Sequence, residues 1–370
     1  MSLDINTKLL LVFSLFCFNV VFAGESGARR ADLGMEGFEQ HGRGLGLSHY
    51  KGRSSHLFNV KSFGARADGL TDDSKAFRAA WKKACQAAGE VDLVIPKGTY
   101  LLGPVKFAGP CTNVSKITVR VKNVKFVGTN RTVVRSITSV NSKFFHMALV
   151  ECKNFKGTKI KISAPADSPN TDGIHIERSS SVHFSRSLIG TGDDCISIGQ
   201  GNSEVTITSI SCGPGHGISV GSLGRYRKEG DVSGLVVRDC TITGTTNGIR
   251  IKTWANSPDR SAATNMTFEN IHMNNVTNPI IIDQAYCPFA SCTPMGTSQV
   301  KLSDIYFKKI KGTSSSAVAV TLECSKGIPC QDIYLEDVHL DLASGEKQAT
   351  STCKNVRAKY IGTQIPPPCA

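Results

Sequence analysis

Short segments of alternating apolar and polar residues recur along the chain from about residue 90, and the clearest of them recur at a fixed interval. Gly173–Ile176, Cys195–Ile198 and Gly217–Val220 begin 22 residues apart, and Gly248–Ile251 begins 31 residues after the third. A repeat of this size with two or three short strands is typical of a parallel β-helix, because each coil buries its inward apolar residues against the next. We therefore predict an all-β fold, a parallel β-helix that forms a single domain over residues 57–370.

A second column of apolar segments supports the same register. It runs through Val182–Phe184, Val205–Ile207 and Val236–Val237, and later through Ile305–Phe307 and Ile333–Leu335. Equivalent positions on successive coils of such a stack lie about 4.8 Å apart. Residues 22 apart in the sequence are therefore expected to be near neighbours, and the nine extra residues before Gly248 are expected to form a loop at 223–231.

One segment has helical periodicity instead. Asp72, Asp73 and Ser74 precede a set of apolar residues spaced for one helix face, namely Ala76, Phe77, Ala80, Trp81, Ala84 and Ala88. The pattern predicts a capped amphipathic helix over 72–88. We expect it to cover the open N-terminal edge of the stack, since an uncovered row of strand edges invites aggregation.

The first 56 residues are expected to stand outside this domain. Lys8, an apolar run from Leu9 to Phe18 and a small residue at Ala23 are typical of a secretory signal peptide, residues 1–23. The alternative, a membrane anchor, is disfavoured because the run is short and interrupted. Residues 24–56 contain eight glycines and little apolar periodicity, and we interpret them as a flexible leader.

The composition gives the net charge of the chain and indicates the redox compartment in which it folds. The 43 Lys and Arg residues against 30 Asp and Glu residues give a net charge of +13, which favours a polyanionic partner: nucleic acid, anionic lipid or an acidic polysaccharide. Removal of the signal peptide leaves twelve of the thirteen cysteines, an even number in a compartment that allows disulfides. Close pairs such as Cys324 with Cys330 and Cys287 with Cys292 are candidates. Asn113, Asn130, Asn265 and Asn275 lie in sequences that can accept glycans.

The 22-residue register gathers acidic residues. Asp172, Asp194 and His216 occupy the same position on three consecutive coils, and Asp193 precedes Asp194. Strict alternation would turn Asp172 and Asp194 inward, so the interpretation requires the chain to bend at Gly173 and Cys195. Such clustering raises the pKa of one carboxyl while others stay charged, which is what glycosidic hydrolysis by an acid and a base requires.

Two cationic residues lie beside the acids in this register, and two other interpretations of the acidic residues compete with hydrolysis. Arg250 and Lys252 fall on outward positions and would supply a paired cationic surface adjoining the acids. Aspartates and glycines also make ordinary turns in repeat proteins. A calcium site is a further alternative, although this donor set suits calcium only loosely.

These motifs resemble those of a known family. Asn170-Thr171-Asp172, Gly192-Asp193-Asp194, Gly215-His216-Gly217 and Arg250-Ile251-Lys252 occur in the order of the four signatures of the polygalacturonases, glycoside hydrolase family 28. The resemblance extends from about Phe58 to Cys369. The run from Cys212 to Ser219 is similar to the plant, pollen-type enzymes, which favours exo action.

The resemblance implies a right-handed β-helix that hydrolyses α-1,4 bonds of polygalacturonate with inversion. It implies that Asp193 is the general acid, that Asp172 and Asp194 activate water, and that His216 tunes the acid. Arg250 and Lys252 would bind the galacturonate carboxylate, and Tyr286 resembles a subsite tyrosine. We therefore expect the protein to be a secreted, monomeric cell-wall enzyme with no metal, cofactor, nucleic-acid partner or membrane partner.

One departure from the family lies in the N-terminal third. The family has a glycine-rich coil there that ends near an Asp-Gly-Gln-Gly motif, and nothing similar occurs between Gly109 and Ser136. We therefore expect one coil or more to be missing. Two other functions remain as alternatives: a calcium-dependent pectate lyase and a non-catalytic, pectin-binding β-helix.

Overall fold

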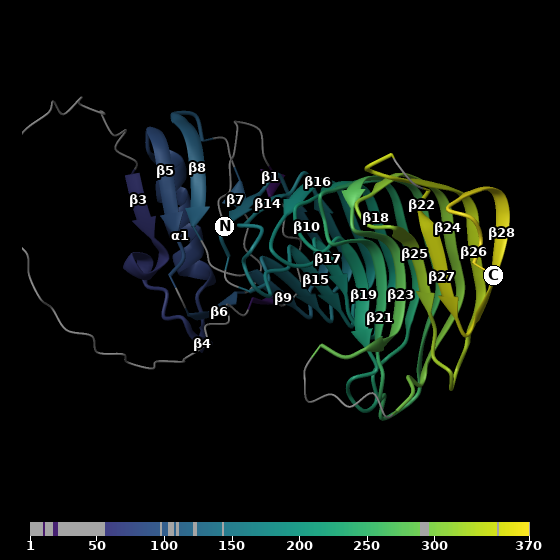
Figure 1. The fold of residues 1–370 in the computed structure, drawn as a ribbon. Coiled ribbons are helices and arrows are strands. Elements are labelled where there is room, and N and C mark those ends of the chain that lie inside the picture. The colour runs from purple at the N-terminus through teal and green to yellow at the C-terminus, as the bar shows by residue number, and fades with distance from the viewer. Residues whose placement is uncertain are drawn as a thin grey trace, which may run out of the picture.

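A stack of short strands forms most of the molecule and ends in a small block that contains the main helix (Figure 1). The computed structural model describes residues 56–96, 98–102, 107–108, 111–120, 124–142, 144–288, 296–345 and 348–369, and the backbone of 10–11 and 18–20.

Two long sheets, both parallel over the coils, make the stack. Strands β10, β13, β16, β18, β20, β22, β24, β26 and β28 pair in that order in one sheet, which also holds β11 and β14. The other runs from β9 through β12, β15, β17, β19, β21, β23 and β25 to β27. The strands of the first are Asn130–Arg135, Thr138–Val140, Lys153–Thr158, Lys161–Ser163, Ser180–Gly190, Ser203–Cys212, Val232–Thr243, Ser261–Val276, Val300–Ser314, Cys330–Leu342 and Val356–Ile365. Those of the second are Val124–Val127, Met147–Val150, Ile174–Glu177, Ile196–Ile198, Ile218–Leu223, Asn247–Trp254, Asn278–Tyr286, Val318–Glu323 and Thr350–Lys354.

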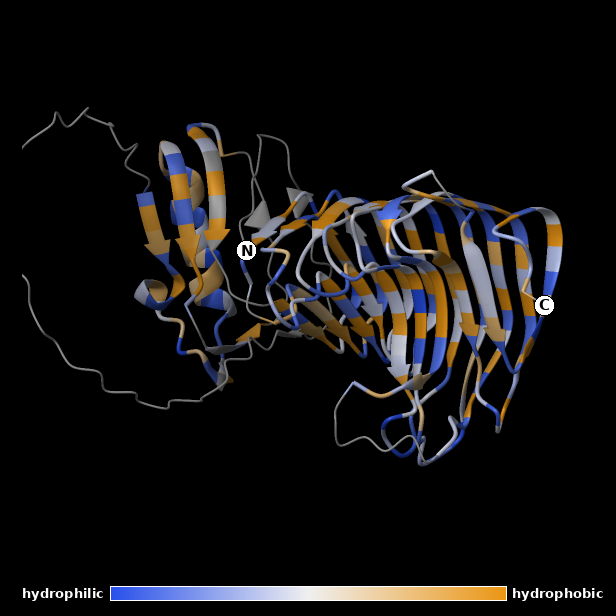
Figure 2. Ribbon diagram, viewed as in Figure 1, coloured by the Kyte–Doolittle hydropathy of each residue, from blue (hydrophilic) through white to orange (hydrophobic). Residues whose placement is uncertain are grey.

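The predicted register is confirmed. Ile174 pairs with Ile196, Ile196 with Ile218, and Ile218 with Ile249, so the 22-residue and 31-residue intervals each correspond to one coil. The fold is the predicted right-handed parallel β-helix. Hydrophobic and hydrophilic residues alternate along its strands (Figure 2).

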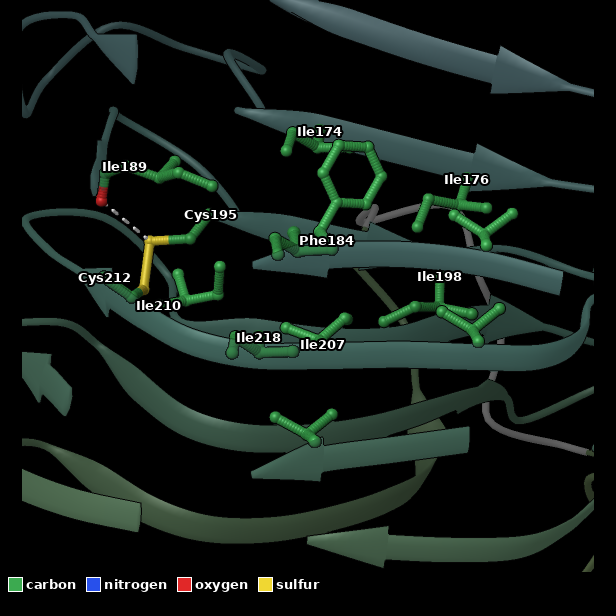
Figure 3. Packing of buried hydrophobic residues seen from close by; sticks show 14 of the residues in the cluster. Ile174, Ile176, Phe184, Ile189, Cys195, Ile198, Ile207, Ile210, Cys212 and Ile218 are labelled. Carbon is green, nitrogen blue, oxygen red and sulfur yellow. Dashed lines mark hydrogen bonds between the residues drawn. A yellow bond between two sulfur atoms is a disulfide. The ribbon is translucent and has the colours of Figure 1, made fainter. Parts of the chain in front are cut away.

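Inward side chains fill the interior of the stack. Ile174, Ile196 and Ile218 are fully buried. Ile207 and Phe184 from the opposite sheet also point into this interior, beside Ile174 and Ile218 (Figure 3). Ladders of this kind stabilise each coil against its neighbours, and truncating one such isoleucine to alanine typically costs about 2–5 kcal/mol.

A helix within the predicted range 72–88 is confirmed as α1, Ser74–Gln86. Two details of the prediction were wrong, because Ala88 lies beyond the helix end and is exposed, and the N-cap residue Asp73 makes no side-chain hydrogen bond to the helix. The helix buries Phe77 and Trp81 and belongs to the block that also contains β3, β5 and β8 (Figure 1). The other elements of this region are β3 (His56–Asn59), the 3-10 helix η1 (Val60–Phe63), β4 (Asp68–Asp72), β5 (Gly89–Val94), β6 (Thr99–Leu102), β7 (Phe107–Ala108) and β8 (Val114–Arg120).

The ladders are interrupted where the sequence predicts a missing coil. Strands β3, β5 and β8 form a separate sheet that ends at β8, while the long sheet starts at β10. In the described part of the second sheet, β6 and β9 do not pair with each other. The backbone of β2 (Phe18–Val20) lies antiparallel between them, and β1 (Leu10–Leu11) pairs with β7.

The N-terminal expectations are otherwise untested by the structure. Most of the expected signal peptide and residues 24–55 of the expected leader lie outside the described residues, and β3 begins at His56, one residue before the expected domain boundary. Among the described helices, none has the length and apolar character that a membrane crossing requires.

Disulfides join segments at both ends of the stack and at its centre. The bonded pairs are Cys85–Cys111, Cys195–Cys212, Cys324–Cys330 and Cys353–Cys369. The prediction for Cys324 and Cys330 is therefore confirmed. Cys287 is also disulfide-bonded, but Cys292, its predicted partner, lies outside the described residues. Cys152 and Cys240 are buried free thiols.

Candidate active site

The predicted acidic residues meet at one edge of the second sheet. Asp172 lies before β15, Asp193 and Asp194 lie before β17, and His216 lies before β19, so they stand at the amino ends of three neighbouring strands. None of the four is inside a strand, which resolves the parity conflict. The bend after Asp172 requires glycine, because a Cβ on Gly173 would lie 2.5 Å from the carbonyl oxygen of Cys195.

Asp193 and His216 form a hydrogen-bonded pair that faces solvent. Nδ1 of His216 lies 2.9 Å from Oδ1 of Asp193, and 43% and 22% of the two side chains are exposed. The backbone N–H of His216 also donates to the carbonyl of Asp193 at 2.8 Å. This approach needs Gly217, which has a φ of +82° and whose added Cβ would lie 2.0 Å from a backbone oxygen of Asn247.

Asp172 and Asp194 are buried behind this pair and each accepts a hydrogen bond from a serine hydroxyl. Oγ of Ser197 donates to Asp172 and Oγ of Ser219 donates to Asp194, both at 2.6 Å. Burial and the neighbouring carboxylate of Asp194 raise the pKa of Asp172 to about 8. Asp172 is therefore the carboxyl that keeps its proton near neutral pH in the free protein.

Both cations predicted beside the acids are paired with a carboxylate, and for Lys252 that carboxylate belongs to one of the predicted acids. Nζ of Lys252 lies 3.0 Å from Oδ2 of Asp194. Nη2 of Arg250 lies 2.9 Å from Oδ2 of Asp283, and its Nε is buried with no hydrogen-bond partner among the described residues. The Tyr286 ring lies beside both cations, 5.1 Å from the Arg250 guanidinium carbon and 5.7 Å from Lys252 Nζ.

These pairings set the protonation of the cluster. Burial alone would raise the pKa of Asp193, but the hydrogen bond from His216 and its charge lower it. The same hydrogen bond raises the pKa of His216 against the effect of burial. Burial would lower the pKa of Lys252, and the charge of Asp194 raises it instead. The transferable proton of the exposed pair therefore resides on His216 in the free protein.

Three residues at the site were missed by the sequence reasoning. Ser197 and Ser219 hold the buried carboxylates, and Asp283 holds Arg250. The signal for the serines was present, since Ile-Ser-Ile and Ile-Ser-Val repeat at outward positions one coil after each aspartate. The pairing of Arg250 with Asp283 had no such signal, because either could have faced solvent.

The cluster has donor atoms that a metal ion could use. One ligand atom from each of Asp193, Asp194 and His216 lies within 4.8 Å of the others. The ammonium of Lys252 already occupies the Asp194 carboxylate, so a divalent cation would have to compete with a buried ion pair.

Curated relatives match most of the chain. An exopolygalacturonase of Platanus acerifolia is 40% identical over 371 aligned positions, covering 85% of this chain and 97% of its own. A polygalacturonase of Gossypium barbadense is 41% identical and covers 84% and 90%. Because 85% of 370 residues is about 315, about 56 positions of the Platanus alignment have no counterpart here, in keeping with a missing coil.

Solved structures and family models agree with these relatives. The crystal structure of a hyperthermoactive exopolygalacturonase from Thermotoga maritima shares the fold, with 18% identity, a TM-score of 0.55, and coverage of 83% of this chain and 92% of its own. Residues 57–107 match the model described as rhamnogalacturonase A/epimerase, pectate lyase-like, and residues 120–362 match that of glycosyl hydrolases family 28. With the acids, the histidine and the cations at the positions of the four motifs, the chain belongs to glycosyl hydrolases family 28.

Proposed function

We propose that this protein is a polygalacturonase that hydrolyses the α-1,4 bonds of polygalacturonate with inversion. The observation that supports this most is the juxtaposition of three carboxyl groups and His216 with two cations, Arg250 and Lys252, at one face of the sheet. Acids alone would serve many hydrolases. Acids beside paired cations suit a sugar that carries a carboxylate.

Arg250 and Lys252 bind the galacturonate carboxylate in this proposal, with Tyr286 packed beside the sugar. About 20% of the Arg250 side chain is exposed, so its guanidinium can meet that carboxylate from the solvent side while Nη2 stays bonded to Asp283. The net charge of +13 favours the approach of a polymer with one negative charge per sugar.

Asp193 and His216 together supply the proton for the leaving oxygen. The pair holds one proton between two coupled groups, which in the free protein lies on His216. A bound uronate displaces water from the pair, and this desolvation raises the pKa of Asp193 and lowers that of His216, which moves the proton onto Asp193. Asp193 then donates to the glycosidic oxygen as the bond to the anomeric carbon breaks.

Asp194 and Asp172 activate the attacking water. A carboxylate accepts one proton from the water while the oxygen of the water bonds to the anomeric carbon from the face opposite the leaving group. We assign this step to Asp194, whose Oδ2 lies 3.0 Å from Nζ of Lys252. Asp172, whose pKa is about 8, is protonated near neutral pH in the free protein. It can accept a proton from the attacking water only after it has ionised.

The names of the plant relatives and the N-terminal sequence support proposals for the mode of action and the location of this protein. The Platanus and other plant relatives are named exopolygalacturonases, and we extend exo action to this chain. We further propose secretion to the plant cell wall through the signal peptide at 1–23, and action as a monomer. Asn113, Asn265 and Asn275 have exposed side chains suited to glycans, whereas Asn130 is half-buried.

The test measures reducing ends released from polygalacturonate by the mature protein, with and without a chelator. Hydrolysis that survives chelation, gives no unsaturated product and falls at least about 100-fold in Asp193→Asn supports the proposal. Chelator-sensitive release of an ultraviolet-absorbing product would instead identify a lyase, and binding without release would identify a non-catalytic wall protein. Release of single sugars rather than mixed oligomers supports exo action.

A further inference from the structure

The loop that accounts for the 31-residue interval, residues 224–231, is held in one conformation by its own side chains. The carboxylate of Glu229 accepts the backbone N–H groups of Gly224, Arg225 and Tyr226 at 2.6, 2.8 and 2.8 Å. Three hydrogen bonds to one carboxylate close the loop into a compact turn. A surface loop without a role has no need of this order.

A second anchor ties the loop to the next coil. The carboxylate of Asp259 accepts the backbone N–H of Lys228 at 3.0 Å and is 3.4 Å from Nη1 of Arg227. The loop is thus closed on itself by Glu229 and tied to the connection between β21 and β22 by Asp259. Side chains on it are preorganised, which lowers the entropic cost of binding a ligand.

Arg225 extends the cationic row of the active site. Its guanidinium carbon lies 5.0 Å from the ring centre of Trp254, and Trp254 packs edge to face against Tyr286 at 5.6 Å. Since Tyr286 lies beside Arg250, the aromatic rings connect Arg225 to the carboxylate-binding cations without a gap.

The loop stands opposite the acids. Arg225 follows the carboxyl end of β19, and Trp254 and Tyr286 pair in register at the carboxyl ends of β21 and β23. In Figure 1 the strands of this sheet point toward the lower edge, where the long loops extend. The acids lie at the amino ends of strands of the same sheet, so Arg225, Trp254 and Tyr286 stand at the opposite ends of the strands.

Two exposed side chains of the loop at 224–231 have chemistry suited to the recognition of a uronate. Arg225 is exposed and stacks on Tyr226 at 5.2 Å, and 63% of Tyr226 is exposed. A planar guanidinium binds a carboxylate through two hydrogen bonds, and an open aromatic face packs on the C–H face of a sugar.

We propose that Arg225 and Tyr226 form an additional galacturonate subsite: Arg225 binds the carboxylate of a sugar further along the chain than the one held by Arg250 and Lys252, and Tyr226 packs against that sugar. The inference rests on the proposed function and deepens it. It assigns a substrate-binding role to the loop and predicts that longer, unesterified chains are preferred because of it.

The test compares Arg225→Gln with Lys228→Gln on a series of oligogalacturonates. Both variants remove one positive charge from the same loop, but Lys228 takes part in the Asp259 anchor through its backbone N–H, which the substitution keeps, and its side chain is exposed. We expect Arg225→Gln to lower kcat/KM on polygalacturonate about 10-fold or more, chiefly through KM, and Lys228→Gln to stay within about twofold. Tyr226→Ala should give a smaller loss of the same kind, with the melting temperature unchanged in all three.

Chain length separates a subsite from a charge effect. The loss in Arg225→Gln should vanish on digalacturonate and appear once the oligomer is long enough to reach the loop, and it should shrink on methyl-esterified chains. Equal losses in Arg225→Gln and Lys228→Gln at every length, removed by salt, would mean long-range attraction and overturn the subsite. Wild-type kinetics in Arg225→Gln at every length would also overturn it while leaving the proposed function intact, whereas an inactive wild-type protein would overturn the proposed function itself.

Discussion

Breaking the Lys252–Asp194 ion pair should destabilise the protein far more than breaking a surface pair of the same length. The two charged atoms lie 3.0 Å apart, and only 12% and 4% of the side chains are exposed. Lys252→Met keeps the volume of the side chain and removes its charge. It leaves Asp194 as a buried carboxylate with only the Ser219 hydroxyl as a partner among the described side chains.

The magnitude follows from burial. Removing one partner of a buried ion pair costs about 3–5 kcal/mol, because the remaining charge stays desolvated and unpaired. Unfolding entropy of about 2.1 cal/mol/K per residue gives about 0.6 kcal/mol/K for a domain of about 300 residues, so the melting temperature should fall by about 5–8 °C. Asp194→Asn in the same chain removes the stranded charge and should recover at least about half of this loss.

The assay is differential scanning calorimetry at one pH and one scan rate on wild type, Lys252→Met, Asp194→Asn and the double variant. Lys354→Met is the matched control, since Lys354 lies 3.1 Å from Glu323 but 67% and 38% of those side chains are exposed. The control should shift the melting temperature by about 1 °C at most. Equal shifts in Lys252→Met and Lys354→Met, or no recovery in the double variant, would refute the reasoning.

Further predictions concern the rest of the site. The hydrogen bond to Asp193 raises the pKa of His216, so the imidazole keeps its proton above the usual value of 6.5 and loses it as pH rises through the raised pKa. We expect kcat/KM to fall across that pH range. If the same alkaline decrease in kcat/KM occurs in His216→Asn, this proton has no role in it. Arg250→Ala should raise KM about 10- to 100-fold with a smaller change in kcat, and an unchanged KM in steady-state assays would exclude the carboxylate contact. The pKa of Asp172 is raised from 3.8 to about 8, so between these values the unfolded chain ionises this group and the folded chain does not. Wild type should therefore lose stability as pH rises through that window. Asp172→Asn lacks this loss, so its melting temperature should match wild type near pH 4 and exceed it increasingly toward pH 8; a difference that does not grow with pH would contradict the shift.

Much of the fold could be predicted because a β-helix converts sequence period into spatial proximity. The 22-residue interval between Ile174 and Ile196 is one coil, and the same interval places Asp172, Asp194 and His216 at neighbouring strand ends. The interruption between β8 and β10 was also foreseeable, from the absence of one coil. The register and the clustering of the acids depend on spacing alone, whereas the missing coil was predicted from the comparison with the family's motifs.

Which carboxyl holds the proton was decided by the tertiary structure. Asp172 and Asp193 are both aspartates in matching motifs, yet burial raises the pKa of one and the bond to His216 lowers that of the other. Desolvation and opposite charges act over a few ångströms, and no spacing rule specifies them. The pairing of Lys252 with Asp194, 58 residues apart, is of the same kind. The sequence by itself determined the order of the coils and the residues that meet; only the folded chain determined their burial and partners, and hence their charges.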